Sequence, residues 1–199
     1  MEVKRSISQN RKNIVTEHDA RNAIKTLLQY IGENPEREGL IDTPQRVVKA
    51  WDEMTSGYWQ DPECILGRDF EKRGYDGMII VPRIEFSSVC EHHLMSFWGH
   101  VWVGYLPGKH GRVVGLSKIP RLVECFARRL QIQEGMTKDI SNAMQSILKP
   151  AGVAVRIEAK HSCMCFRGVM KQDASMITTS LTGVFKQHKV REEFLLQCK

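Results

Sequence analysis

The spacing of apolar residues changes along this chain, and that change constrains the fold more than any other feature. From Glu17 to Ile31, apolar residues recur three or four positions apart until Gly32, a pattern typical of an amphipathic helix. Beyond residue 78, two strand-like runs precede two helical runs, and two further strand-like runs follow. Since strands in consecutive pairs favour antiparallel pairing, this order predicts an α+β fold with an antiparallel four-stranded sheet.

The part that precedes the sheet is predicted to be an N-terminal helical region. Thr43 is the expected cap of a second helix, Pro44 suits its first position, and Gly57 ends it. The expected buried face of this helix consists of Val47, Val48, Trp51 and Met54. Residues 58–77 are rich in glycine and charge and are expected to form a loop. We divide the chain into a flexible N-terminus at 1–16, the helical region at 17–77 and a sheet-containing domain at 78–199.

The sheet-containing domain is expected to hold four strands and two long helices. The expected strands span residues 78–89, with a break near Pro82, and 100–106, 153–159 and 175–182. Ser117 is the expected cap of the first helix, whose inward residues are Ile119, Leu122, Val123, Phe126 and Ala127. The second helix, near 134–148, is expected to bury Met136, Ile140, Ala143, Met144 and Ile147. A short helix near 190–197 ends the chain.

Composition favours a cytoplasmic protein with an anionic partner. The 29 Lys and Arg residues exceed the 23 Asp and Glu residues, and the net charge of +6 suits either nucleic acid or a small polyphosphate. No five basic residues follow one another, which weakens the case for a nucleic-acid arm. Apolar runs are too short for a membrane span, and the N-terminus lacks the apolar stretch of a secretory signal.

Two short segments concentrate residues that bind metals. In a reducing cytoplasm, the six cysteines are better explained as metal ligands, catalytic groups or core residues than as disulfides. Cys90 and His93, in the segment CEHH, are three positions apart, so a turn can direct a thiolate and an imidazole at one ion. The second segment is HSCMC at 161–165. Thiolate and imidazole ligands together suit zinc.

The number of zinc ligands is open from spacing alone. If the strand before HSCMC continues through it, His161, Cys163 and Cys165 share one face. A structural site closes with four protein ligands, whereas a catalytic site keeps three and leaves a position for water. Cys165 or His92 could supply a fourth ligand. Adjacent histidines and a buried cysteine also occur without any metal, but two ligand-rich segments at expected strand ends favour a metal site.

Four segments together resemble the GTP cyclohydrolase I family. They are CEHH at 90–93, GLSKIPR at 115–121, RRLQIQE at 128–134 and HSCM followed by RGV at 161–169. The resemblance runs from about Asp42 to Phe185, and four motifs in family order are far more specific than CEHH alone. It implies a tunnelling fold, in which sheets from several subunits close into an oligomeric β-barrel. It also implies a homodecamer of two face-to-face pentamers, with active sites between subunits in the catalytic domain 78–199.

The resemblance further implies a reaction. Zinc-dependent hydrolysis opens the imidazole ring of GTP at C8, releases formate and forms 7,8-dihydroneopterin triphosphate, the first step of pteridine and folate-type biosynthesis. By matching position, the zinc ligands are Cys90, His93 and Cys163. His92 and His161 are the implied acid–base residues, with the division of proton transfers between them open, and Ser117 is a candidate for later transfers. Cys165 falls where the family has no ligand, so an open three-ligand site is favoured.

The expected triphosphate contacts are cationic side chains near a helix start. Lys118 and Arg121 lie one helical turn apart beside Ser117, where backbone N–H groups also favour an anion. Arg167 and Arg46 are further candidates, since arginine suits bidentate phosphate contact. Without the motif positions, each would be read as a solvated surface charge.

The expected guanine contact is a carboxylate. Guanine presents N1–H and a 2-amino group side by side, and the resemblance places Glu134, with Gln133 beside it, to bind them. Without the resemblance, both residues would be read as exposed helix positions. Glu91 is open as a residue that supports the metal ligands or as a structural one.

Some positions depart from the commonest family pattern, namely Ser96, Trp102, Gly135 and Met176. None is an expected ligand or catalyst, so they bear on substrate affinity and subunit contacts. One rival function is a sister enzyme of the same fold that acts on another pterin or deazapurine. Another is a zinc-stapled nucleic-acid-binding module, which predicts a closed four-ligand site. The sequence leaves open a regulatory partner and the pathway that consumes the product.

Overall fold

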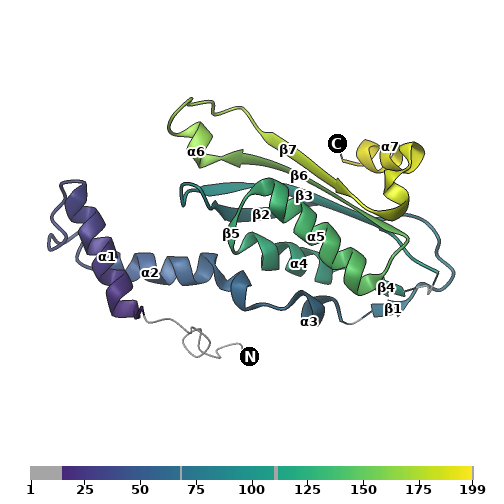
Figure 1. Cartoon of the computed structure of the whole chain (residues 1–199), viewed down its shortest axis with the longest axis horizontal. Coiled ribbons are helices and arrows are strands. Elements are labelled where there is room, and N and C mark those ends of the chain that lie inside the picture. The colour runs from purple at the N-terminus through teal and green to yellow at the C-terminus, as the bar shows by residue number, and fades with distance from the viewer. Residues whose placement is uncertain (1–14, 68, 110–111, 199) are drawn as a thin grey trace.

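A computed structural model describes residues 15–67, 69–109 and 112–198 of the chain. Its centre is a five-stranded sheet with the strand order β5-β2-β3-β6-β7 (Figure 1). The strands are β2 (Ile79–Cys90), β3 (Ser96–Leu106), β5 (Leu130–Gln131), β6 (Gly152–His161) and β7 (Met176–Leu181). The predicted α+β class and the four predicted strands are confirmed, and β5 is an addition to them.

Most of the sheet is antiparallel, as predicted. β2 pairs with β3, β3 with β6, and β6 with β7, all antiparallel. β5 instead runs parallel to β2, through Val89 and Cys90 alone. A register shift between Val81 and Ile84 confirms the predicted break near Pro82. β3 begins at Ser96, four residues before the expected start, so the strand reaches back almost to the CEHH segment.

Two helices cover one face of the sheet. They are α4 (Lys118–Ala127) and α5 (Gln133–Leu148). All five predicted inward residues of α4 are buried. In α5, Met136, Ile140 and Met144 are fully buried, whereas Ala143 and Ile147 are only partly so. These side chains join the inward residues of the strands in the main hydrophobic core, which fixes the starts and ends of the helices relative to the strand ends.

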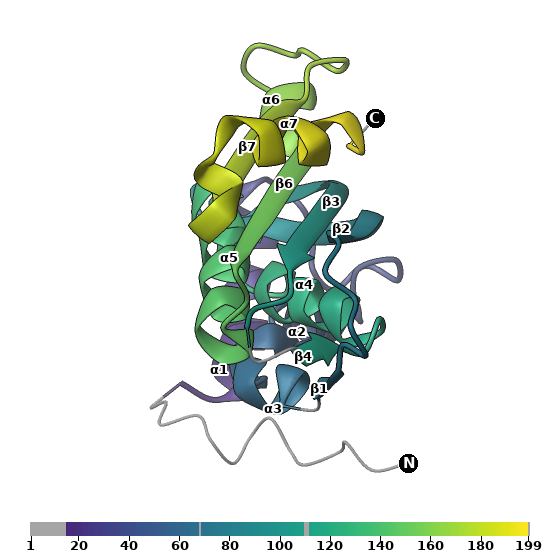
Figure 2. The same cartoon turned by 90° about the vertical axis from the view of Figure 1, so that its right-hand side faces the viewer.

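The other face of the sheet is covered only at one end. There η3 (Gly183–Lys186) and α7 (His188–Leu196) pack over Trp102, Ala154 and their neighbours in a second core cluster (Figure 2). The ring of Phe194 in α7 lies so close to Gly104 that a Cβ there would approach it to 2.8 Å. The rest of this face carries the exposed Trp98 and Ile177 beside polar and charged side chains such as Glu158 and Lys160.

The N-terminal helices extend away from the sheet (Figure 1). They are α1 (Glu17–Tyr30) and α2 (Thr43–Met54), and they pack on each other. Thr16 caps α1 in a capping box with Asp19. The expected cap of α2 was wrong by one residue, because Asp42 occupies the cap position and Thr43 is already helical. Residues 1–14 of the predicted flexible N-terminus lie outside the described residues.

The expected loop at 58–77 was wrong in part. It includes the end of η2 (Ser56–Trp59), a short helix α3 (Pro62–Leu66) and the strand β1 (Asp69–Glu71). β1 pairs with β4 (Arg112–Val114), and the Arg112 guanidinium donates to the Asp69 carboxylate. These partners are far apart in sequence, so local spacing could not predict the pair. Among the described helices, none is both long and apolar enough to cross a membrane.

Candidate metal centre and active site

The two ligand-rich segments meet at one end of the sheet. β2 ends at Cys90, and a tight turn, closed by hydrogen bonds from Leu94 N to Cys90 O and from Cys90 N to Met95 O, leads into β3. β6 ends at His161, which pairs with Phe97 near the start of β3. Because β2 and β6 flank β3 and run antiparallel to it, their final residues lie at the same end.

Three side chains converge there into a group that fits a metal ion. The ligand atoms of Cys90, His93 and Cys163 lie within 4.8 Å of one another. Cys90 is buried, Cys163 is half-buried and His93 is exposed, so the group opens to solvent on the histidine side. Burial and the adjacent Cys90 thiol raise the pKa of Cys163. A divalent cation would reverse this by favouring both thiolates, and two thiolates with one imidazole suit zinc.

Cys165 is not part of this group. A shared face for His161, Cys163 and Cys165 would require the strand to continue through HSCMC, but Ser162–Cys165 form the short helix α6, so the two-residue alternation stops at His161. Cys165 is buried, and its Sγ lies 3.9 Å from the carbonyl oxygen of Gln172. The condition for a face shared by His161, Cys163 and Cys165 is therefore not met.

His161 lies in a half-buried position between a ring and an amide. Its imidazole stacks on Phe97, with centroids 4.6 Å apart and planes inclined by 2°. Its Nε2 lies 2.9 Å from Oε1 of Gln133, the first residue of α5. Burial lowers the pKa of His161, and Glu134 has a smaller effect in the opposite direction. The Phe97 stack could not be predicted from the sequence, because the strand that carries Phe97 was expected to begin only at residue 100.

His92 and Arg167 flank the metal-compatible group from the exposed side. His92 is exposed, and its Nε2 lies 4.0 Å from a carboxylate oxygen of Glu91. Arg167 places Nη1 3.3 Å from Nε2 of His93. The expected phosphate-binding arginine is thus adjacent to one expected metal ligand. Within the turn, the backbone N–H of Glu91 donates to the carbonyl oxygen of Gln131 in β5, so this two-residue strand supports the CEHH segment.

Gln133 and Glu134 at the start of α5 differ in exposure. Glu134 is exposed, as it would be read without the resemblance, whereas Gln133 is only 1% exposed and its amide is hydrogen-bonded within the chain. The guanine-binding role of both residues stays a prediction.

The remaining expected substrate residues do not join this group within one chain. α4 begins beside β4, at the end of the sheet opposite to α6, and runs back toward β5 (Figure 1). Lys118 and Arg121 are therefore separated from the metal-compatible group by most of a helix of ten residues, or about 15 Å. Ser117 occupies the cap position of α4, as expected, but its side chain makes no capping hydrogen bond. Arg46 lies on α2 and pairs with Asp42.

Comparison with known proteins identifies the family. The family model described as GTP cyclohydrolase I matches residues 20–199 of this chain. The chain belongs to the GTP cyclohydrolase I family. The predicted family membership is confirmed, and with it the prediction that the chain is an enzyme.

Curated relatives agree with this assignment. GTP cyclohydrolase 1 of Wolinella succinogenes is 50% identical over 173 residues, which cover 86% of this chain and 91% of that protein. GTP cyclohydrolase 1 of Brucella canis is 54% identical over 170 residues, covering 85% of this chain and 79% of that protein. Among solved structures, an archaeosine synthase QueF-Like in the apo form matches 55% of this chain and 96% of that chain, with 16% identity and a TM-score of 0.42.

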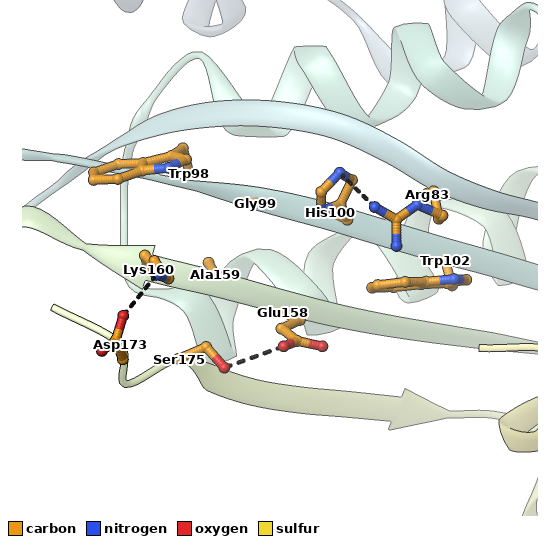
Figure 3. Close-up of a pocket in the computed structure, with 10 residues that line it drawn as sticks. All are labelled: Arg83, Trp98, Gly99, His100, Trp102, Glu158, Ala159, Lys160, Asp173 and Ser175. Carbon is orange, nitrogen blue, oxygen red and sulfur yellow. Dashed lines mark hydrogen bonds and ion pairs between the residues drawn. The ribbon is translucent and has the colours of Figure 1, made fainter. Parts of the chain in front are cut away.

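A pocket of about 410 Å³ in this GTP cyclohydrolase I family member lies away from these residues. Trp98, His100 and Trp102 of β3 line it from the face that α4 and α5 do not cover (Figure 3). His161 pairs with Phe97, whose side chain points to the opposite, helix-covered face. The polar groups in the pocket contact one another, as in the pairs Lys160–Asp173, Ser175–Glu158 and Arg83–His100. The pocket is therefore outside the candidate active site.

Proposed function

We propose that this enzyme hydrolyses the imidazole ring of GTP at C8, releasing formate and forming 7,8-dihydroneopterin triphosphate. The observation that carries the proposal is the convergence of Cys90, His93 and Cys163, in a chain that belongs to the GTP cyclohydrolase I family. The family and its curated relatives support GTP as substrate, and the positive net charge of the chain suits a triphosphate.

We propose zinc as the ion held by the two thiolates and the imidazole. When bound there, zinc supplies an activated water nucleophile at neutral pH, which an aromatic purine carbon requires. Three protein ligands leave a coordination position open, and the position of Cys165 beside Gln172 O supports a group of three. This open group also weighs against the zinc-stapled nucleic-acid-binding module, which needs four.

The proposed reaction needs groups that move protons. Protonation of N7 makes C8 more electrophilic, and a further proton must move as the formyl group leaves. We assign these transfers to His161 and His92 as a pair. Burial of His161 favours its neutral form in the free chain, and a bound polyanion would favour the protonated form that donation requires. Ser117 remains our candidate for proton transfer in the later rearrangement.

We propose that the substrate is held by Glu134 at guanine and by Lys118, Arg121 and Arg167 at the triphosphate, with Arg46 a weaker candidate. Arg167 is near the metal-compatible group, but Lys118 and Arg121 of the same chain lie toward the opposite end of the sheet. If Lys118 and Arg121 bind the same triphosphate as Arg167, the start of α4 comes from a second copy. This supports the proposal of an oligomer with active sites between subunits.

Both edges of the sheet support such an oligomer. Within the part of the chain that the structure describes, β7 is an edge strand, and β2 pairs on its outer side only through its last two residues. Unpaired strand edges can join those of other copies, as the tunnelling fold and its barrel require. We propose the homodecamer of two pentamers on this basis, with residues 78–199 as the catalytic domain. A cytoplasmic location and a place in pteridine or folate-type biosynthesis belong to the same proposal.

The direct test is turnover of GTP by the purified, zinc-loaded protein. We expect one formate per GTP consumed, and a product that becomes a fluorescent pterin after oxidation. A folded, zinc-loaded oligomer that leaves GTP unchanged would refute the proposal. Turnover of another pterin or a deazapurine in place of GTP would favour the sister enzyme.

Replacement of His92 separates proton transfer from metal binding. We expect His92→Ala to lower kcat by about 10²–10⁴-fold, the usual contribution of a general acid or base, while zinc content per chain stays near that of the wild type. The measurements are formate release and zinc by atomic emission. His188→Ala is the matched control, because His188 is exposed on α7, where its Nδ1 lies 3.3 Å from a carboxylate oxygen of Glu192. Loss of zinc from His92→Ala would mean that His92 is a ligand.

A further inference from the structure

The side chain of Gln133 joins His161 to three acceptors in the sheet. Its Nε2 lies 3.2 Å from the carbonyl oxygen of Ile157, 3.0 Å from that of Met176 and 3.1 Å from Oγ1 of Thr178. Its Oε1 lies 2.9 Å from Nε2 of His161. The residue is 1% exposed, so these neighbours account for its hydrogen bonding.

The neighbours of Gln133 determine which end of its amide is which. A backbone carbonyl only accepts, so the group that faces Ile157 O and Met176 O must be the NH₂. The oxygen of the amide therefore faces His161. An amide oxygen also only accepts, so Nε2 of His161 must donate and must carry the proton. A flipped amide would set one NH₂ against the histidine and an oxygen against two carbonyls.

We infer that Gln133 is a positioning residue that holds His161 in the Nε2–H tautomer and so leaves Nδ1 to exchange protons during the reaction. This inference rests on the proposed function for the reaction, but the tautomer itself does not. In a neutral imidazole one nitrogen donates and the other accepts, so fixing Nε2–H exposes the lone pair of Nδ1. The stack on Phe97 fixes the plane of the ring, and the Gln133 amide fixes its rotation in that plane.

The amide of Gln133 is itself held in place. Thr137, one turn further along α5, donates to the backbone carbonyl of Gln133 at 2.6 Å. The hydroxyls of Thr137 and Thr178 are 2.6 Å apart, and because Thr137 has used its only hydrogen, Thr178 donates to it. Thr178 then keeps a lone pair to accept from Gln133 Nε2. The Gln133 NH₂ has two hydrogens for three acceptors, so one hydrogen is shared, and this cycle of three residues ties α5 to β7.

The inference differs measurably from the predicted guanine-binding role of Gln133. A residue that only binds the purine raises KM when it is lost, whereas a residue that orients a proton-transfer group lowers kcat. We expect Gln133→Met to lower kcat by about 10–100-fold, the usual effect of losing the partner that orients a functional histidine, with KM within about 3-fold. The matched control is Ser141→Ala, which removes another partly buried hydrogen bond between α5 and β7, the one that joins the Ser141 and Ser180 hydroxyls at 2.6 Å. We expect this control to leave kcat within about 2-fold.

A double-mutant cycle tests whether Gln133 acts through His161. In a His161→Ala background, we expect Gln133→Met to cause no further loss of kcat, because its only catalytic partner is gone. Additive losses, or a rise in KM with kcat preserved, would overturn the inference. Thermal unfolding of the Gln133→Met and Ser141→Ala proteins shows whether lost stability explains any difference between them.

The tautomer can be read without turnover. In zinc-loaded protein labelled with ¹⁵N-histidine, solid-state NMR distinguishes a protonated from a bare ring nitrogen, and the His161→Ala protein assigns the signals. We expect His161 to carry its proton on Nε2 in the wild type and to become a mixture of tautomers in Gln133→Met. A wild-type proton on Nδ1 would overturn the inference. An inactive wild type with the Nε2–H tautomer would instead refute the proposed function alone.

Discussion

Replacing Cys163 with alanine is expected to remove both the bound zinc and the release of formate. Cys163 supplies one of the two thiolates of the metal-compatible group, and the two remaining ligands cannot hold zinc as three do. We expect zinc to fall from about one ion per chain to near none. Formate release should fall by about 1,000-fold or more, because several kcal/mol of transition-state stabilisation disappear with the ion.

The matched control is the cysteine two positions away. Cys165 has the same side chain and lies in the same short helix, but it is buried beside Gln172 rather than in the ligand group. We expect Cys165→Ala to keep zinc and turnover and to cost about 1 kcal/mol of stability, as for a lost methyl-sized group in a core. If Cys165→Ala instead lost the zinc, or if Cys163→Ala kept it, the ligand assignment would be wrong. Freshly reduced protein is needed, since the thiols of Cys90 and Cys163 are close enough to interact.

The meeting of the two ligand-rich segments could be predicted from the sequence because each follows an expected strand. Cys90 and His93 are in one tight turn, and HSCMC follows a strand whose alternation is clear, whereas the choice of Cys163 rather than Cys165 as third ligand came from the family resemblance. The same holds for the inward faces of α4 and α5, whose period of apolar residues survives in the fold. The roles of these site residues still rest on the predictions above.

Other features depend on contacts between distant segments, which a local period cannot reveal. β5 has two residues and therefore no alternation to read, and β1 exists only because residues near 113 pair with it. Gln133 reads as an exposed helix start, yet β6 and β7 close over it. β6 extends to His161, two residues past its expected end, and the chain then forms a helix at Ser162–Cys165, which the cysteine spacing did not indicate.

The proposed site has two halves that lie toward opposite ends of the sheet within one chain. Cys163 and His161 are at one end of the sheet, whereas Lys118 and Arg121 are at the start of α4, near the other end. If a neighbouring copy supplies the start of α4, a chain defective in one half can be rescued by a chain defective in the other. If one chain holds the whole site, no such rescue is possible.

Mixed oligomers of two inactive variants are therefore expected to regain activity. We would co-express Cys163→Ala with the double variant Lys118→Ala, Arg121→Ala under different affinity tags and isolate oligomers that contain both. When the two variants assemble at random in equal amounts, each site has a one-in-two chance of an intact metal-binding half. It has the same chance of an intact α4 start from its neighbour. We expect about one quarter of wild-type formate release per chain, against near none for either variant alone.

Rescue should depend on which halves are combined. A pair of variants defective in the same half, Cys163→Ala with His161→Ala, gives every site at least one lesion in its metal half, so mixed oligomers should stay inactive. Rescue by that pair would show that Cys163 and His161 do not belong to the same half of the site. Verified mixed oligomers of the first pair without rescue would mean that Lys118 and Arg121 serve the site of their own chain, or none. Either result bears on the interface alone, because the wild-type protein measures turnover independently of both.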